Sequence, residues 1–422
     1  MNKMGWANTM LAPYRVLDLT DDKGFLCGKI LGDYGADVIK IEKPGGDPAR
    51  KIGPFYHDIP DPEKSLNWFC YNLNKRGITL DIETADGKAI FKKLVEKADF
   101  VIESFPVGYL DRLGLCYKEL EKVNPRIILT SISPFGQTGP YSHYKGADIT
   151  CMGMAVIMYL SGDADRPPVR ISAPQAFMCA GADAASASLV AHYHRQKTGQ
   201  GQWVDVSAQE SLICTTMNAN PFWYLDKRLE TRVGPLRGGL SSAPNRQVWP
   251  CKDGFISFAF WSTFYKAGLI SNKALVDWIA SDGMSNEYLD SIDWKTWNIT
   301  VQTKEDWEKL QVPLFNFVLT KTKSELHAEA LKRRILLVPV TTPRDLVNDE
   351  QLAARGYWVE VDHPELDGKL LYPGAFMRVL GADPLKIKRR APLIGEHNEE
   401  IYRDMLGLKA EDMIILKQGG TI

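Results

Sequence analysis

The amino-acid sequence predicts an α/β protein in which helices cover both faces of a parallel sheet. The first observation is an apolar, β-branched segment at 14–20, followed by helical spacing over 23–36 and a second apolar segment at 37–42. Strand, helix and strand in this order form a βαβ unit. The second observation is that the pattern recurs, with strands expected at 77–82, 99–103 and 126–131 and a helix at 85–98. Such alternation is typical of parallel sheets.

A second, smaller domain is expected in the middle of the chain. Residues 173–194 are small and apolar and predict a buried helix, and residues 199–207 predict a turn and a strand. Residues 235–250 are rich in Gly, Pro and Ser without periodicity, which favours a domain boundary. The stretch from about 250 to 335 combines a strand with helices. Strands, turns and a terminal helix follow from Val338.

Length and composition indicate a soluble cytoplasmic protein. A chain of 422 residues favours two domains. Its 51 basic and 52 acidic side chains balance, so no overall charge draws it to nucleic acid or to a membrane surface. Seven cysteines without a CxxC pattern favour a reducing compartment over disulfides or zinc. We expect no export and no membrane span, because neither a signal-peptide pattern nor a run of about 18 apolar residues occurs.

Several strings, read in order, resemble class III CoA-transferases, the family that includes formyl-CoA transferase and carnitine CoA-transferase. They are GADVIKIEKPGGDPAR, NLNKRGITLDI, LDRLG, NPRIILTSISPFGQTGPY, HRQKTGQGQWVDVS, NDEQLAARGYWVEVDHP and RRAPLIGEHNEEIY. The ordered set extends from residue 35 to residue 402. A dinucleotide-binding dehydrogenase is disfavoured, because the first predicted βα turn, KGFLCG, lacks the G-x-G-x-x-G string.

The resemblance implies a Rossmann-like large domain built from both chain ends, a smaller α+β middle domain, and two subunits interlocked as a dimer. The expected division is a large domain over 1–205, a linker over 206–240, a small domain over 241–335, a return linker over 336–380, and a segment completing the large domain over 381–422. A subunit without catalytic residues would still be needed for such an interlocked assembly.

The resemblance implies that coenzyme A and acyl-CoA are substrates and that no cofactor is tightly bound. A polyanion that carries an adenine needs cations for its phosphates and an apolar slot for its ring. The positions that match the family's CoA contacts are Lys43, Leu80, Asp81, Ser104, Phe105, Arg112 and Lys145. Alternative roles stay open, since Leu80 also suits a core, Lys43 and Lys145 also suit a solvated surface, and Arg112 also suits a capping or ion-pairing role.

The family's chemistry depends on one aspartate, which attacks the donor thioester to form an anhydride and then carries CoA as an aspartyl thioester. In relatives it precedes a T-G-x-G-Q string by a little over 20 residues. In this chain the string is Thr198–Gln202. Counting back places the position of the nucleophile, called the slot below, at Gln175, Ala176 or Phe177. The whole stretch 171–182 has no carboxylate. This chain is therefore expected to have no catalytic residue of its own.

Relocated nucleophiles are the alternative, and the nearest candidates are Asp163, Asp165 and Asp183. Asp183 lies about two helical turns beyond the slot, roughly 10 Å away. The two loop aspartates are typical of solvated turns. The glycine-poor string GGLSSAP at 238–244 and the Ala147 that replaces the histidine of the racemase branch also argue against independent catalysis and against racemase activity.

The resemblance therefore implies a non-catalytic subunit that pairs with a paralogous chain carrying the aspartate. The expected reaction moves CoA from an acyl-CoA donor, succinyl-CoA, to a carboxylic acid such as (R)-benzylsuccinate. An active homodimer with a relocated carboxylate and an acyl-CoA-binding pseudoenzyme are the alternatives. No metal site is expected, because His192 and His194 point to different helix faces. His397 in GEHNEE is expected to be structural.

Overall fold

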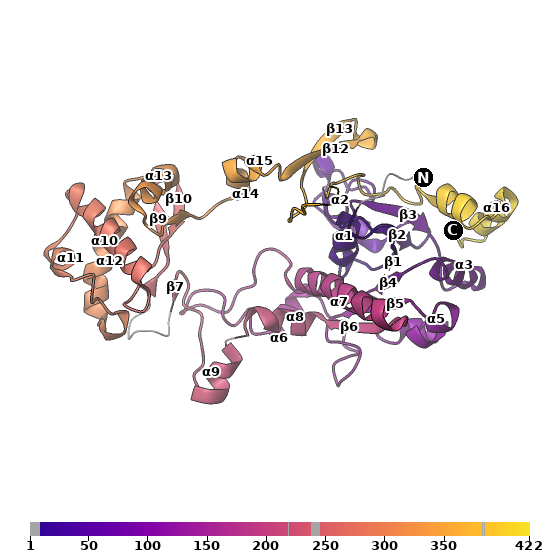
Figure 1. Ribbon diagram of the computed structural model, residues 1–422, viewed down its shortest axis with the longest axis horizontal. Coiled ribbons are helices and arrows are strands. Elements are labelled where there is room, and N and C mark those ends of the chain that lie inside the picture. Colours follow the sequence, from indigo (N-terminus) through magenta and orange to yellow (C-terminus); the bar gives the residue numbers. More distant parts are fainter. Residues whose placement is uncertain (1–8, 218, 238–244, 382, 384) are drawn as a thin grey trace. The chain divides into compact units, whose positions relative to one another are not determined.

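The computed structural model describes residues 9–217, 219–237, 245–381, 383 and 385–422. The chain divides into two compact units (Figure 1). Unit 1 comprises residues 1–155, 172–215 and 350–422, and unit 2 comprises 156–171 and 216–349. The finer division into linkers at 206–240 and 336–380 stays a prediction.

Unit 1 contains the predicted parallel sheet, and the α/β fold class is confirmed. Its six strands lie in the order β3-β2-β1-β4-β5-β6 and all adjacent pairs are parallel. The strands are β1 (Arg15–Leu19), β2 (Asp37–Glu42), β3 (Lys75–Thr79), β4 (Phe100–Glu103), β5 (Ile128–Ser133) and β6 (Trp203–Ser207). Because β1 lies between β2 and β4, the chain builds outward in both directions from β1.

Helices cover both faces of this sheet (Figure 1). Alternate strand residues, among them Leu17 and Val101, share a core with helices α3 (Ala85–Val95), α5 (Tyr117–Val123) and α16 (Ala410–Gln418). Helices α1 (Phe25–Asp33) and α7 (Ala176–Thr198) pack on each other and on the sheet. The remaining helices and strands of unit 1 are α2 (Leu66–Tyr71), α4 (Tyr109–Leu113), α6 (Asp148–Met154), α8 (Ala208–Thr215), α15 (Glu350–Ala354), β12 (Trp358–His363) and β13 (Gly368–Pro373).

The T-G-Q-G-Q string ends α7 and joins it to β6. Gly199 is the left-handed residue after the helix, with φ 79°, a conformation that favours glycine. A Cβ on Gly201 would lie 1.8 Å from the carbonyl oxygen of Ile127, so only glycine fits this close approach to β5. The two glycines thus set the register between the end of α7 and the sheet.

A buried ion network anchors β1 to its neighbours. The Lys75 ammonium donates to Asp18 Oδ2 at 2.7 Å and to Asn72 Oδ1 at 2.9 Å, and Lys40 lies 3.7 Å from Asp18 Oδ1. All three charged side chains are fully buried. A Cβ on Gly28 would lie 2.2 Å from Asp18 Oδ2, so α1 can approach the network only with glycine there. This network supports the β1–α1 turn, where the candidate site begins.

The edge strand β3 is covered by the C-terminal segment. The backbone N–H of Gly77 donates to His397 Nδ1 at 3.1 Å, and the backbone N–H of Thr79 donates to Asn398 Oδ1 at 2.9 Å. A π-helical turn, Glu399–Met405, follows. Side chains therefore replace the missing strand neighbour and satisfy an edge that would otherwise be open to pairing.

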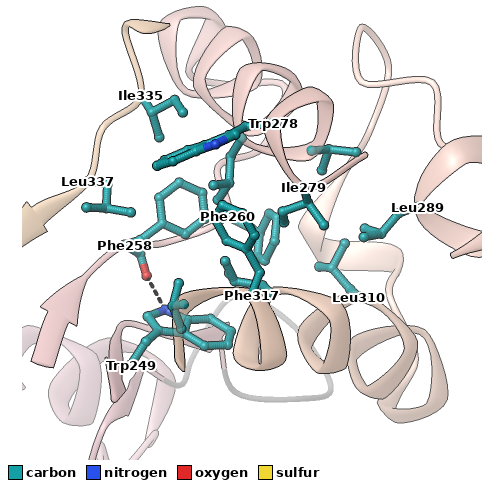
Figure 2. Packing of buried hydrophobic residues seen from close by; sticks show 14 of the residues in the cluster. Trp249, Phe258, Phe260, Trp278, Ile279, Leu289, Leu310, Phe317, Ile335 and Leu337 are labelled. Carbon is teal, nitrogen blue, oxygen red and sulfur yellow. Dashed lines mark hydrogen bonds between the residues drawn. The ribbon is translucent and has the colours of Figure 1, made fainter. Parts of the chain in front are cut away.

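Unit 2 is a smaller α+β unit with its own aromatic core. Its antiparallel sheet has the order β11-β10-β9. Figure 2 shows Trp249 and Trp278 packed around Phe258 and Phe260, with Trp249 Nε1 donating to the Phe258 carbonyl at 2.8 Å. The helices and strands of unit 2 are α9 (Ala219–Asp226), β7 (Leu236–Arg237), β8 (Asn245–Arg246), β9 (Val248–Cys251), β10 (Gly254–Ser257), α10 (Lys266–Ser281), α11 (Glu287–Ser291), α12 (Lys304–Leu319), α13 (Lys323–Arg333), β11 (Val338–Pro339) and α14 (Pro343–Val347).

Candidate active site

The carboxyl ends of β1 and β4 form the point where the sheet topology reverses. In open α/β sheets, ligands bind in the crevice at such a point. The two strand ends are joined there by side chains, since the Asp21 backbone N–H donates to Ser104 Oγ at 2.9 Å and that hydroxyl donates to Asp21 Oδ1 at 2.7 Å. Ser104 is buried and directly follows β4. The turn after β1 is thereby held against the turn after β4.

A cavity of about 640 Å³ lies at this crevice. Four of the seven residues predicted to contact CoA line it: Lys43, Leu80, Ser104 and Phe105. Leu80 is only 1% exposed and belongs to the core, which confirms the core interpretation, whereas its contact with CoA stays a prediction. The structure thus brings these four residues to one cavity large enough for part of a nucleotide-like ligand.

The other three predicted contacts do not line this cavity. The backbone N–H of Asp81 donates to the carbonyl of Thr421, and its carboxylate accepts from the backbone N–H of Glu83 at 3.0 Å. Arg112 is exposed, with its guanidinium 5.7 Å from the ring centre of Tyr109, a residue that does line the cavity. Lys145 is exposed in the segment before α6. Their contact with CoA stays a prediction.

The cavity is more acidic than a polyanion site requires. Asp21, Asp22, Glu42, Asp47 and Glu83 line it, and Lys43 is the one cation among its lining residues in the described chain. Lys43 is itself bound 3.0 Å from the Glu83 carboxylate. Burial raises the pKa of Asp22, and the neighbouring charge of Asp21 raises it further. Glu42 is paired with Arg50, and Asp21 with Lys23, so part of this negative charge is compensated by cations outside the lining.

Glu103 is a functional candidate that the sequence interpretation missed. It ends β4, next to Ser104, and is 4% exposed. Burial raises its pKa to about 7, although hydrogen bonds from Ser131 and from the backbone N–H of Phe105 at 2.7 Å favour the ionised form. A carboxyl group that titrates near neutral pH beside a ligand crevice is a feature of functional sites. Nothing in the apolar pattern of β4 signals this burial.

The predicted slot of the nucleophile lies at the amino end of α7. Gln175 precedes the first helical residue, and Ala176 and Phe177 are 0% and 5% exposed. The Gln175 amide is turned back to the Pro174 carbonyl at 2.9 Å. No side chain from the slot itself therefore offers a carboxylate at this helix terminus.

A carboxylate reaches the slot from elsewhere in the chain. Asp148 Oδ1, at the start of α6, accepts hydrogen bonds from the backbone N–H groups of Gln175 at 2.9 Å and Ala176 at 2.8 Å. Its second oxygen, Oδ2, is buried and has no hydrogen-bond partner among the described residues. Asp148 directly follows Gly146-Ala147, where the racemase branch has a histidine, so the sequence did draw attention to this position. The sequence could not show that Asp148 caps α7, whose first residues lie 27 positions further along the chain.

The three aspartates considered from the sequence lie elsewhere. Asp183 is exposed on α7, roughly 10 Å along the helix from Ala176. Asp163 and Asp165 are exposed in unit 2, where Asp163 lies 3.9 Å from Arg166. The glycine-poor string at 238–244 lies outside the described residues. Among the aspartates of the described chain, Asp148 is the one hydrogen-bonded to the slot.

The described chain offers neither a metal centre nor a membrane-spanning helix. No group of three or more His, Cys, Asp or Glu side chains is arranged to hold a metal ion within the described ranges. His192 instead contacts Arg195 and Gln196. Across the same ranges, every helix is too short or too polar to cross a bilayer.

Comparison with known proteins supports the fold and the family resemblance of the sequence strings. Residues 11–398 match the model of CoA-transferase family III. The chain is 34% identical over 397 residues to the succinyl-CoA:(R)-benzylsuccinate CoA-transferase subunit BbsE of Thauera aromatica, covering 92% of each chain. It is 30% identical over 396 residues to the succinyl-CoA--D-citramalate CoA-transferase of Chloroflexus aurantiacus, covering 93% of each. A crystal structure of a CAIB/BAIF family protein from Brucella suis matches with a TM-score of 0.78 at 28% identity, covering 94% of this chain and 99% of that one. The resemblance inferred from the sequence strings is confirmed, and the chain belongs to CoA-transferase family III.

Proposed function

We propose that this chain is the non-catalytic subunit of a heteromeric class III CoA-transferase. The observation that carries the proposal is the amino end of α7, where Gln175, Ala176 and Phe177 supply no carboxylate. The helix terminus is instead capped by Asp148, which uses one oxygen to bind two backbone N–H groups. A paralogous chain would carry the nucleophilic aspartate and complete the enzyme as an interlocked dimer in the cytoplasm.

The proposed reaction transfers CoA from succinyl-CoA to a carboxylic acid, with (R)-benzylsuccinate as the first acceptor to test. The relative from Thauera aromatica supports this choice, because its name describes one subunit of an enzyme with that donor and that acceptor. The second relative also uses a succinyl-CoA donor by name. We propose that any CoA held by this chain contacts Lys43, Leu80, Ser104 and Phe105, with Asp81, Arg112 and Lys145 nearby, and that it binds more weakly than in the partner.

The test compares this chain alone, its paralogue alone and the two expressed together. We expect CoA transfer from succinyl-CoA only when the paralogue is present. Hydroxylamine cleaves an aspartyl thioester and leaves a hydroxamate on the aspartate. During turnover of the complex, mass spectrometry should find the hydroxamate on the partner and none on this chain. Rapid transfer by this chain purified alone would refute the proposal.

A second candidate function is an active subunit in which Asp148 is the relocated carboxylate. The observation that favours it is the buried Asp148 Oδ2, which has no hydrogen-bond partner in the described chain. Under this reading, hydroxylamine would label Asp148, and Asp148→Asn would abolish transfer by the isolated chain. Asp183→Asn is the matched control, because Asp183 is exposed on the same helix that Asp148 caps. If hydroxylamine labels neither Asp148 nor Asp183, the result supports the non-catalytic subunit.

A further inference from the structure

A second cavity, of about 500 Å³, lies beside the covered edge of β3 in unit 1. Its lining shares no residue with the 640 Å³ cavity at the switch point. The charged and titratable residues that line it are Glu360, Asp362, Lys388, Arg389, Arg390, Glu396 and His397. Because both basic and acidic side chains line this cavity, the charge of the ligand that it can bind depends on which of these side chains are already in ion pairs.

The hydrogen bonds of β3 determine the protonation of His397. Its Nδ1 accepts the backbone N–H of Gly77, which has no other partner because β3 is an edge strand. The neutral imidazole must then carry its proton on Nε2. Burial lowers the pKa of His397, and the nearby cations Arg389 and Arg76 oppose its protonation as well, although Glu396 favours it. His397, a lining residue of the cavity, therefore presents an Nε2–H donor on the side of the ring that faces Arg389.

The guanidinium of Arg389 is a second hydrogen-bond donor that lies next to the Nε2–H of His397. Its Nη1 lies 3.3 Å from His397 Nε2. A guanidinium has only donors, so neither group can accept from the other. Two N–H donors at this distance repel unless they share an acceptor, and an oxygen carrying negative charge satisfies both at once.

The acids around Arg389 are already engaged. Glu396 binds Arg390 through both oxygens, at 2.8 and 2.9 Å, and Glu400 binds Arg76 at 2.7 Å. No carboxylate of the described chain forms an ion pair with Arg389. Burial and the charge of Arg76 lower the pKa of Arg389, whereas the carboxylates of Glu400, Asp37 and Glu396, beyond ion-pair distance, raise it. A largely desolvated guanidinium without a counter-ion is the feature that an anionic ligand would complete.

We propose that Arg389 and the Nε2–H of His397 bind a small oxyanion, either a carboxylate or a phosphate group, in the 500 Å³ cavity. The planar guanidinium fork matches both groups, and the imidazole N–H supplies a third donor. Glu360 and Asp362 line the same cavity and select against larger polyanions. The site is separate from the CoA pocket and does not depend on the function proposed above.

The proposal is tested on the purified full-length chain, without a partner subunit. Inorganic phosphate and succinate are titrated by calorimetry at constant ionic strength, with chloride as the reference anion. We expect binding of at least one, and the stronger of the two identifies the source of the oxyanion. Arg389→Gln should weaken binding at least tenfold, whereas Lys386→Gln, an exposed neighbour outside the cavity lining, should leave it unchanged.

Two further measurements keep the test decisive if Arg389→Gln impairs folding. Arg389→Lys retains the charge but loses the fork, and should bind more weakly than wild type while melting at the same temperature. In the unmodified chain, phosphate or succinate should shift the ring resonances of His397 and not those of His327, which lies in unit 2. Absence of binding by both anions, or equal loss in the Arg389 and Lys386 variants, would overturn the proposal.

Discussion

Placing an aspartate in the empty slot, as Ala176→Asp, tests how far the site departs from a catalytic one. Ala176 is 0% exposed, and its backbone N–H already donates to Asp148 Oδ1 at 2.8 Å. The introduced carboxylate would lie roughly 5 Å from that of Asp148. At an effective dielectric constant of about 20, two such charges repel by about 3 kcal/mol. A penalty of that size is worth more than 100-fold in rate if the nucleophile must be ionised to react.

The assay uses the complex in which the partner's own nucleophile has been replaced, so that only this chain can react. We expect Ala176→Asp to give neither CoA transfer nor a hydroxamate after hydroxylamine treatment. Ala176→Asn is the matched control, because it adds nearly the same side-chain volume at this buried position without the charge. It should fold normally and stay inactive.

A double variant isolates the repulsion. Adding Asp148→Asn to Ala176→Asp removes one charge of the pair and should recover about 3 kcal/mol of unfolding free energy relative to the single variant, measured by urea denaturation. Activity of the single Ala176→Asp chain within about tenfold of the catalytic subunit would refute this reasoning. It would show that the site lacks only its carboxylate and that Asp148 does not obstruct it.

Three further predictions concern stability and binding. Asp18→Asn should cost about 3 to 5 kcal/mol in urea denaturation, because it leaves the fully buried Lys75 ammonium without its counter-ion. With the pKa of Glu103 raised to about 7 mainly by burial, the folded state holds this proton more tightly than the unfolded state. Stability should therefore fall by about 3 kcal/mol as the pH rises from about 4.5 to 7, and Glu103→Gln should remove that decline; an unchanged pH profile would contradict it. Asp22→Asn should strengthen CoA binding in calorimetry, because it removes one of the acids that line the cavity. Weaker binding by this variant would contradict the prediction.

The strands were predictable because each carries a run of apolar, β-branched residues. The prediction at 37–42 coincides with β2, whereas the strand expected at 77–82 is observed at Lys75–Thr79. The apolar pattern fails there because β3 begins with two charged residues that are buried. Lys75 is paired with Asp18, and Arg76 with Asp37 at 2.6 Å. Hydropathy cannot identify a buried charge whose partner lies on another strand.

The candidate site was predictable in its inventory but not in its arrangement. The spacing from the T-G-Q-G-Q string to the slot is preserved because α7 is one continuous helix of 23 residues that ends at Gly199. Counting along a helix is reliable, so the absence of a carboxylate at 175–177 could be read directly. The capping of α7 by Asp148 and the acidic lining of the 640 Å³ cavity involve contacts between separate segments, which sequence spacing does not show.

The sequence by itself determined the family, the α/β class and the absence of a carboxylate at 175–177, since these depend on the order and local chemistry of side chains. Only the tertiary structure decided that Asp148 occupies the empty slot, that four of seven predicted CoA contacts share a cavity with five acids, and that Arg389 faces His397 without an acceptor. The physical reason is that charges act through space over a few ångströms. The distances that set their effect are fixed by strand order and helix packing, which bring residues far apart in the chain into contact.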